Sequence, residues 1–199
     1  MSKNFIDAIK ERRSIYAISK ESPISDDKII EIVEDVVKNV PSAFNSQTTR
    51  TVILLGEKHD KLWDITMEAL RKIVPEKDFE STEARINSFK AGHGTVLFFE
   101  DFAVVKSLQE QFELYKDNFP VWALQTSGMM QFSVWTAFAT EGIGGSLQHY
   151  TELIDAEVKK EFNIPENWKM FSQMPFGKIV KGAGEKAFNP IEDRVKVLR

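Results

Sequence analysis

The stretch Gly94-Thr95-Val96-Leu97-Phe98-Phe99, residues 94–99, reads as a strand that is buried on both faces. Its apolar residues follow one another without the polar alternation of a half-exposed strand. Thr51–Leu55, bounded by Gly56, is a second short run of this kind, and Trp168–Phe176, followed by Gly177, is a third. The sequence therefore predicts a sheet whose strands lie far apart along the chain.

Helical spacing accounts for most of the remaining chain. Asn4 and Ser25 are the expected N-caps of the first two helices. The second helix is expected to stop at Val40, because Pro41 disfavours helical geometry in the residue before it. Further helices are predicted at residues 61–74, 102–115, about 121–141 and 151–162, the last with Thr151 as its cap.

The order of these elements indicates the fold class. Strands and helices do not alternate regularly, which favours an α+β fold over a doubly wound sheet. No repeat or linker divides the 199 residues, so we expect one domain over residues 1–199. The tail from Lys178 is expected to be irregular until residues 195–198, which could add an edge strand.

Composition argues against several functional classes. The chain has 42% hydrophobic residues and a formal net charge of −4, and this mildly acidic balance argues against nucleic acid as a partner. The absence of cysteine removes disulfides, thiolate nucleophiles and the usual zinc sites. Because His59, His93 and His149 also lack metal-site spacing, no metal is expected.

Hydropathy favours a cytoplasmic protein with no membrane partner. The amino terminus has no apolar core of signal-peptide length before Arg12. The most apolar stretch, residues 119–143, is interrupted by Gln125, Gln131 and Glu141, so we interpret it as a buried helix and not as a membrane span.

Common nucleotide and hydrolase motifs are missing. The sequence has no Gly-x-Gly-x-x-Gly, P-loop or Gly-x-Ser-x-Gly pattern, and the glycines at 142–145 follow a helix where a nucleotide loop would follow a strand. Polar clusters remain at residues 12–14, 42–47 and 146–150, together with late basic residues. Each has a plain explanation, such as cations that complement a helix C-terminus or polar turn residues, so the residues alone leave the function open.

The order and spacing of these clusters resemble the FMN-dependent nitroreductase family. The resemblance rests on Glu11-Arg12-Arg13-Ser14, Pro41-Ser42-Ala43-Phe44-Asn45-Ser46-Gln47 and Glu141-Gly142-Ile143-Gly144. Residues 94–101, 146–150 and 190–197 are similar to a small subfamily of bacteria and fungi, which is linked to oxidative and metal stress and, in fungi, to fatty-acid signalling. The resemblance spans nearly the whole chain. It implies a central mixed sheet flanked by helices, and a homodimer.

The resemblance also implies residues that bind FMN. Arg12 and Ser14 would hold the phosphate and the ribityl end, with Arg13 near the ribityl or pyrimidine side, and Lys186 would return to the phosphate. Guanidinium groups suit this role because they make planar, bidentate contacts to phosphate oxygens. In a homodimer, the partner's loop would supply further contacts through Ser42, Phe44, Asn45 and Gln47, with Phe44 shielding one flavin face.

Three positions depart from the family pattern. Phe188 stands where many members carry an arginine, and Arg194 is the candidate to replace that cation. Tyr16 stands where many members have a cation that stabilises negative charge on reduced flavin. The segment Gln148–Tyr150 matches the loop that passes flavin N5, and His149 stands there in place of a glutamate, as a candidate modulator.

The implied activity is oxidation of NAD(P)H and reduction of a nitroaromatic, a quinone or a peroxide by ping-pong chemistry. No side chain need act as an acid or base, because the flavin carries the chemistry. The alternative is a flavin- or lipid-binding regulator in stress signalling with incidental catalysis, and a scaffold without cofactor is a third hypothesis. Turnover separates the first two, and a colourless protein would indicate the third.

The apolar helix near 121–141 indicates how two subunits would pair. Its large apolar residues include Trp122, Met129, Trp135 and Phe138, more than one core of this size is expected to enclose. We therefore predict that it forms much of a homodimer interface. Periodicity alone fits a central core helix equally well, and the resemblance favours the interface.

Overall fold

The protein is built on a curled antiparallel sheet, and the computed structural model describes residues 4–199. The strands run in the order β1-β5-β3-β2, and β4 also pairs with β5. All ladders between these strands are antiparallel, and the parallel component is the isolated bridge between Ser14 and Gly145. Their bounds are β1 Ala17–Ser19, β2 Thr49–Leu55, β3 Gly94–Asp101, β4 Ile143–Gly145 and β5 Trp168–Lys181.

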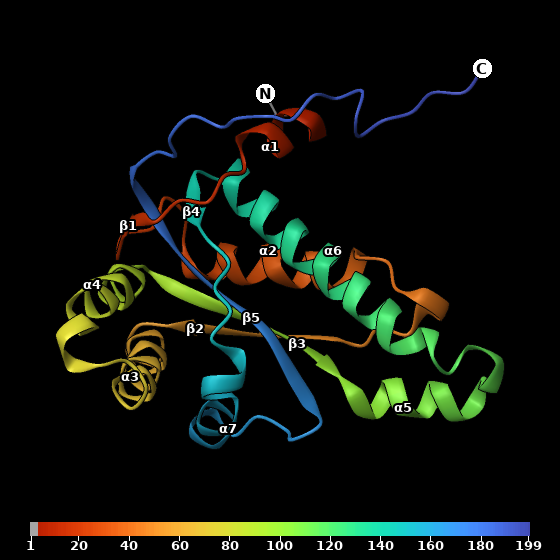
Figure 1. The fold of residues 1–199 in the computed structure, drawn as a ribbon, viewed down its shortest axis with the longest axis horizontal. Helices are drawn as coiled ribbons and strands as arrows, with labels where there is room; N and C mark the ends of the chain where they lie inside the picture. The colour runs from red at the N-terminus through yellow and green to blue at the C-terminus, as the bar shows by residue number, and fades with distance from the viewer. Residues whose placement is uncertain (1–3) are drawn as a thin grey trace.

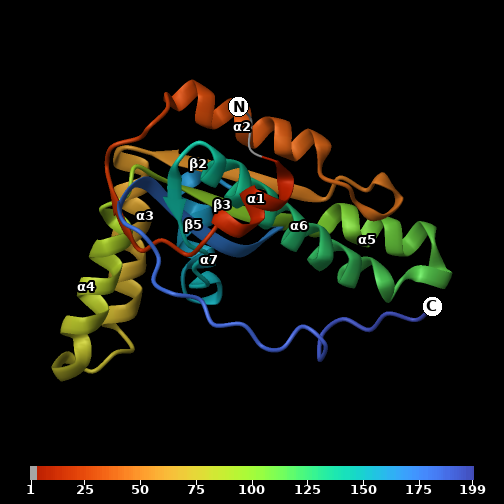
Figure 2. The ribbon, with the colours of Figure 1, turned by 90° about the horizontal axis from the view of Figure 1, so that it is seen from above.

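Helices cover both faces of this sheet (Figures 1 and 2). They are α1 Phe5–Glu11, α2 Asp26–Asn39, α3 Glu57–Arg71, α4 Phe79–Lys90, α5 Phe102–Gln111, α6 Asn118–Thr140 and α7 Thr151–Phe162, with short 3-10 turns η1 Ala43–Asn45, η2 Glu76–Asp78 and η3 Glu113–Tyr115. One core cluster joins α2 and α6 to the sheet, and another joins α3, α4 and α7 to its opposite face. The predicted α+β fold is confirmed.

The strand β3 shows why two cores form. All of its residues are buried, and successive side chains point to opposite faces of a strand. Val96 and Phe98 belong to the core under α2 and α6, whereas Leu97 and Phe99 belong to the core under α3 and α7. The uninterrupted apolar run therefore reflects a strand in the middle of three layers.

The expected ends of the first two helices are also confirmed. The Asn4 side chain accepts a hydrogen bond from the Asp7 backbone N–H at 3.0 Å, and Ser25 Oγ accepts one from the Lys28 N–H at 3.3 Å. Val40 has extended geometry, with φ −68° and ψ 127°, as Pro41 requires of the residue before it.

Several expectations were wrong in detail. The helix predicted over 102–115 ends at Gln111, because Phe112 leaves helical geometry at φ −127° and ψ 69°. Thr151 is the first residue of α7, whose N-cap is Tyr150 with no side-chain cap bond. Residues 195–198 form no strand in the described structure: they lie on the exposed tail, where the Val195 N–H donates to the Ile191 carbonyl at 2.9 Å.

The helix α6 presents apolar residues on two sides. Met130, Val134 and Phe138 are buried against the sheet, whereas Val121 and Leu124 are each 50% exposed. Across residues 4–199, every helix falls short of the length and apolar character that a bilayer crossing would need. The helix is therefore a core helix with a further apolar face left open.

Candidate functional site

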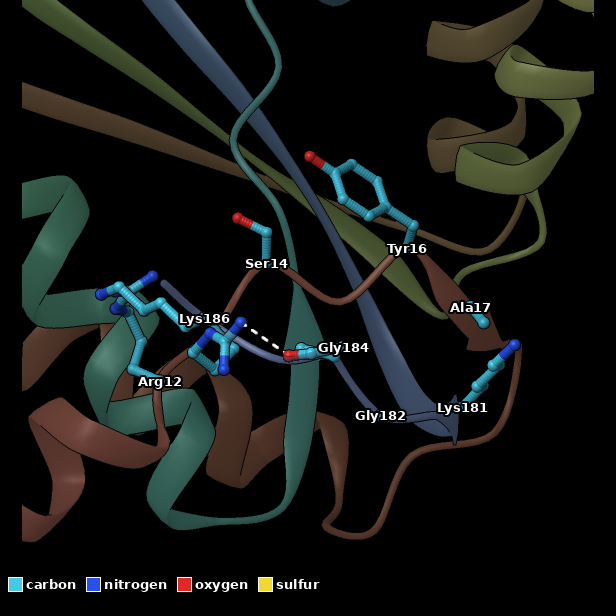
Figure 3. A pocket seen from close by; sticks show the side chains of 10 residues that line it. Arg12, Ser14, Tyr16, Ala17, Lys181, Gly182, Gly184 and Lys186 are labelled. Carbon is cyan, nitrogen blue, oxygen red and sulfur yellow. Dashed lines mark hydrogen bonds between the residues drawn. The ribbon is translucent and has the colours of Figure 1, made fainter. Parts of the chain in front are cut away.

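A pocket of about 510 Å³ lies where the chain before β1 meets the chain after β5 (Figure 3). We call it the cationic pocket, because its lining includes arginines and lysines and no acidic residue. It is lined by Arg12, Arg13, Ser14, Tyr16, Ala17, Lys181, Gly182, Ala183, Gly184 and Lys186. The structure thus brings together five residues that the sequence assigns to cofactor binding, namely Arg12, Arg13, Ser14, Tyr16 and Lys186.

Strand pairing joins the two segments that line the pocket, residues 12–17 and 181–186, which are far apart in the sequence. Ala17 in β1 pairs with Lys181 at the end of β5. The segment that leads into β1 and the segment that follows β5 therefore leave the sheet side by side. Arg13 then donates a hydrogen bond from Nη2 to the Gly184 carbonyl at 2.9 Å. On the other side, the Ile15 N–H donates to the Gly145 carbonyl at 2.9 Å. The pocket is therefore held by backbone pairing and by one hydrogen bond from the Arg13 side chain.

The approach of β4 to this segment explains part of the glycine pattern at 142–145. A Cβ at Gly144 would lie 2.9 Å from Ile15 Cγ2 and 2.8 Å from Ile179 Cγ1. Contacts that short do not occur between real side chains. Only glycine at position 144 therefore lets the segment that carries Arg12 and Ser14 lie this close to β4.

Arg12 is the most constrained cation of the pocket. Its guanidinium lies 4.2 Å from the ring centroid of Trp135. Its Nε atom is buried and has no hydrogen-bond partner among residues 4–199. Burial, and then the charge of Arg13, lowers the pKa of Arg12. A half-buried cation whose buried Nε donor is unpaired, with no acidic residue in the pocket lining, is prepared to receive an anion.

The remaining tail cations differ in place. Lys186 lies on the pocket with its Nζ 5.2 Å from the Phe188 ring centroid. Lys181, which the sequence did not single out as a ligand, lines the pocket at the end away from Arg12 (Figure 3). Arg194 does not line the pocket and lies on the exposed tail, where its N–H donates to the Ile191 carbonyl at 3.0 Å.

The predicted loop of Ser42, Phe44, Asn45 and Gln47 lies elsewhere. Figures 1 and 2 both show η1 beside the ends of α5 and α6, well apart from α1 and β1. Within one chain, the loop therefore does not share the cationic pocket.

The loop has a strained and ordered backbone. Phe44, Asn45 and Gln47 have φ angles of 58°, 51° and 48°, in the region that non-glycine residues avoid. The Gln47 N–H donates to Ser42 Oγ at 2.9 Å. The Phe44 ring contacts an aromatic cluster formed by Phe112, Tyr115, Phe119 and Trp122, with centroids 5.0 to 5.8 Å away. A strained backbone that hydrogen bonds and ring contacts hold in place indicates a functional loop.

The segment Gln148–Tyr150 is fixed against β5. The Gln148 N–H donates to the Gln173 carbonyl at 2.7 Å, and the Tyr150 N–H donates to Gln173 Oε1 at 2.9 Å. The His149 side chain is exposed, and its backbone N–H has no partner within the described part of the chain. Of these three backbone donors, only that of His149 is available to a ligand.

No group of three or more potential metal ligands occurs among residues 4–199. The buried His59 instead contacts the Thr95 hydroxyl and the Lys90 carbonyl, at 2.9 and 3.2 Å. His93 Nε2 contacts Asp26 at 2.7 Å. These two histidines therefore take part in contacts within the chain.

Comparison with known proteins relates the chain to one family. The sequence model described as the nitroreductase family matches residues 9–178. The solved structure of nitroreductase CinD from Lactococcus lactis in complex with nicotinic acid is 49% identical, with a TM-score of 0.92 over 98% of this chain and 100% of that one. From Saccharomyces cerevisiae, putative nitroreductase HBN1 is 37% identical over 92% of both chains, and nitroreductase FRM2 is 33% identical over 93% of both.

Proposed function

The chain belongs to the nitroreductase family, and we propose that it is an FMN-dependent oxidoreductase that uses NAD(P)H to reduce an organic acceptor. The observation that carries this proposal is the cationic pocket, in which the Nε atom of the half-buried Arg12 is buried without a hydrogen-bond partner among residues 4–199 and other cations lie close by. A structural arginine would be expected to pair its buried donors with carboxylates or carbonyls. An anionic ligand accounts for the one that is unpaired here.

The residues of the pocket fit FMN. Its phosphate carries a charge near −2, which suits a guanidinium from Arg12 and an ammonium from Lys186. Ser14 would donate to the same phosphate or to the ribityl chain, and Arg13 lies beside it. Tyr16 is 53% exposed on the pocket wall and would face the flavin without adding charge. Bound there, FMN would supply hydride transfer at N5, in two half-reactions that share one slot.

The protein's own groups would orient these reactants. The free backbone N–H of His149 is the proposed donor near N5, and the exposed imidazole beside it is the proposed modulator. Gln148 acts indirectly, since its backbone is bonded to Gln173 and its side chain donates to Ser146 Oγ at 2.9 Å. No acid–base pair is required of the chain, because positioning and field are its contributions.

We further propose that the site is shared across a homodimer. The loop residues Ser42, Phe44, Asn45 and Gln47 are far from the chain's own pocket (Figures 1 and 2), so they would reach the flavin of a second subunit. An apolar groove of about 430 Å³ lies between α1 and α6. Beside it, Phe5 is 68% exposed. The tail exposes Phe188 and Leu198 to 75% and 83%. A second copy of the chain would cover these surfaces.

The proposed acceptors are nitroaromatics, with quinones and peroxides as further candidates. The relative CinD has been solved in complex with 4-nitrophenol and with chloramphenicol. The aromatic cluster around Phe44 would give a flat acceptor a stacking surface. Arg194 remains a candidate for a supporting cation only if the tail rearranges in the dimer, since Lys186 already occupies the pocket.

The test is the absorption spectrum of the purified protein and its affinity for added FMN. We expect a yellow protein that releases FMN on denaturation, is bleached by NAD(P)H and recovers its colour with an acceptor. Arg12→Met keeps an apolar contact with Trp135 but removes the charge, so FMN affinity should fall about 100-fold.

Arg71→Met is the matched control, because Arg71 also lies on an aromatic ring, 4.3 Å from Phe79, but outside the pocket. A colourless protein that does not bind added FMN would contradict the proposal. Flavin binding with negligible turnover would instead support the regulator.

A further inference from the structure

Arg50, the second residue of β2, holds the end of the strained loop. Its Nη1 donates hydrogen bonds to the Gln47 carbonyl at 2.8 Å and to the Thr49 carbonyl at 3.0 Å. Gln47 is the last residue of the loop with a positive φ, at 48°. The guanidinium thus fixes the direction of the peptide group that follows a strained residue.

Asp101 in turn fixes Arg50. Arg50 Nη2 donates to Asp101 Oδ2 at 2.9 Å, and the Asp101 side chain is only 11% exposed. Asp101 Oδ1 accepts hydrogen bonds from the Ala103 N–H at 3.0 Å and from Asn167 Nδ2 at 2.7 Å. The carboxylate therefore ties the arginine to the start of α5 and to the segment that enters β5.

These contacts attach the loop to one helical pair at two points. Phe44 packs on Phe112 and Trp122, which follow α5 and lie in α6, while Arg50 and Asp101 hold the loop's exit at the beginning of α5. Each positive φ of a non-glycine residue costs about 1 kcal/mol or more. Without the Arg50 contact, the backbone near Gln47 would be free to relax.

We propose that Arg50 is a positioning residue for the flavin site of the partner subunit, acting through the Gln47 carbonyl. This inference rests on the proposed function, because the loop must reach a flavin for its pose to matter. A guanidinium is needed because its separate nitrogens donate to the loop and to Asp101 at once, whereas a lysine ammonium lacks this planar geometry. Arg50 itself need not touch the flavin.

The first measurement is FMN affinity beside the thermal midpoint of the flavin-free protein. Arg50→Met should weaken FMN binding about 10-fold or more, and Arg50→Lys should recover part of the loss. Asp101→Asn should resemble Arg50→Met. Arg71→Met is the matched control, because it breaks an arginine–carboxylate pair with Glu83 at 2.7 Å and leaves the loop untouched. It should change FMN affinity less than twofold. Equal effects of Arg50→Met and Arg71→Met would overturn the inference.

The second measurement separates positioning from a general effect on folding. Arg12→Met and Arg50→Met subunits are unfolded together, mixed and refolded. A mixed dimer has one site with an intact Arg12 and an intact loop, so about a quarter of the wild-type sites should return. A mixture of Arg50→Met with Asn45→Ala should restore none, because both changes affect the loop.

The possible failures are distinguishable. If Arg12→Met is complemented by Asn45→Ala but not by Arg50→Met, Arg50 acts within its own subunit or only on folding, and the inference alone is overturned. If neither mixture restores binding although the wild type binds FMN, the shared site is wrong and the inference fails with it. A wild type that binds no FMN overturns the proposed function itself.

Discussion

Glu100 is a carboxylic acid in the interior of the sheet, with no exposed surface. Its Oε1 accepts a hydrogen bond from the Thr49 hydroxyl at 3.1 Å, and its Oε2 is buried without a partner among the described residues. Burial raises the pKa of Glu100 to about 7. The folded protein therefore keeps a proton on Glu100 at pH values where the unfolded chain has lost it.

The sign of the resulting pH dependence follows from this difference. Protonated Glu100 contributes to the unfolding free energy. This contribution is fully present below the pKa of Glu100 in the unfolded chain, near 4.5, and is lost as the pH rises through about 7. The amide side chain of Glu100→Gln does not ionise, so the variant lacks this pH dependence. Relative to the wild type, this variant should gain about 2 kcal/mol of unfolding free energy between pH 5 and pH 8. Urea titrations of both proteins at the two pH values would measure it. A difference that does not change with pH would show that Glu100 ionises normally.

Individual residues show how much of the candidate site could be predicted from the sequence. Arg12 and Lys186 were assigned to one phosphate by resemblance to a family, and the structure places both on one pocket. Lys181 was not chosen, because nothing local distinguishes it from other surface lysines. Arg50 and Asp101 were not chosen either, since their meeting depends on the pairing of Arg50 with Phe99 in neighbouring strands. Chemistry that depends on a cross-strand register has no local sequence signal.

Among the elements, sequence patterns predicted most of those that carry a core, but α4, whose Phe79, Ile86 and Phe89 are buried, was missed. The strands β2, β3 and β5 have apolar runs, α2 has apolar residues at helical spacing, and α6 is apolar along most of its length. The strands β1 and β4 were missed because three residues are too few for a pattern. These two strands nevertheless position the cationic pocket, since β1 pairs with the end of β5 and the Gly145 carbonyl of β4 accepts a hydrogen bond from the Ile15 N–H. The short elements thus decide the site more than the long ones do.

The open face of α6 leads to a prediction about assembly. Leu124 is 50% exposed on this helix, and Leu124→Arg would place a charge in the proposed apolar interface. Because an uncompensated buried charge costs several kcal/mol, we expect monomers in sedimentation measurements and a loss of FMN binding.

The control places the same charge on the other side of the fold. Ile73 is 64% exposed just after α3, and Ile73→Arg should leave both the assembly and FMN binding unchanged. A Leu124→Arg variant that stays dimeric would exclude this face of α6 from the interface.

At the scale of the whole molecule, the two ends of the chain contribute cations to one pocket. A ligand that bridges Arg12 and Lys186 should therefore stabilise the entire fold, since unfolding must release it. FMN at 100 times its dissociation constant should raise the melting temperature of a domain of this size by about 5–10 °C. Riboflavin has the same ring and ribityl chain but no phosphate, so it should give a much smaller shift.

The contribution of the tail can be isolated in the same experiment. Lys186→Gln should reduce the shift produced by FMN and leave that of riboflavin unchanged, because only the phosphate contacts this lysine. Lys178→Gln removes an exposed lysine near the end of β5 that pairs with Glu21 outside the pocket, and it should affect neither shift. Equal shifts with FMN and riboflavin would mean that the pocket does not hold the phosphate. The buried, unpaired donor of Arg12 would then need another anion to explain it.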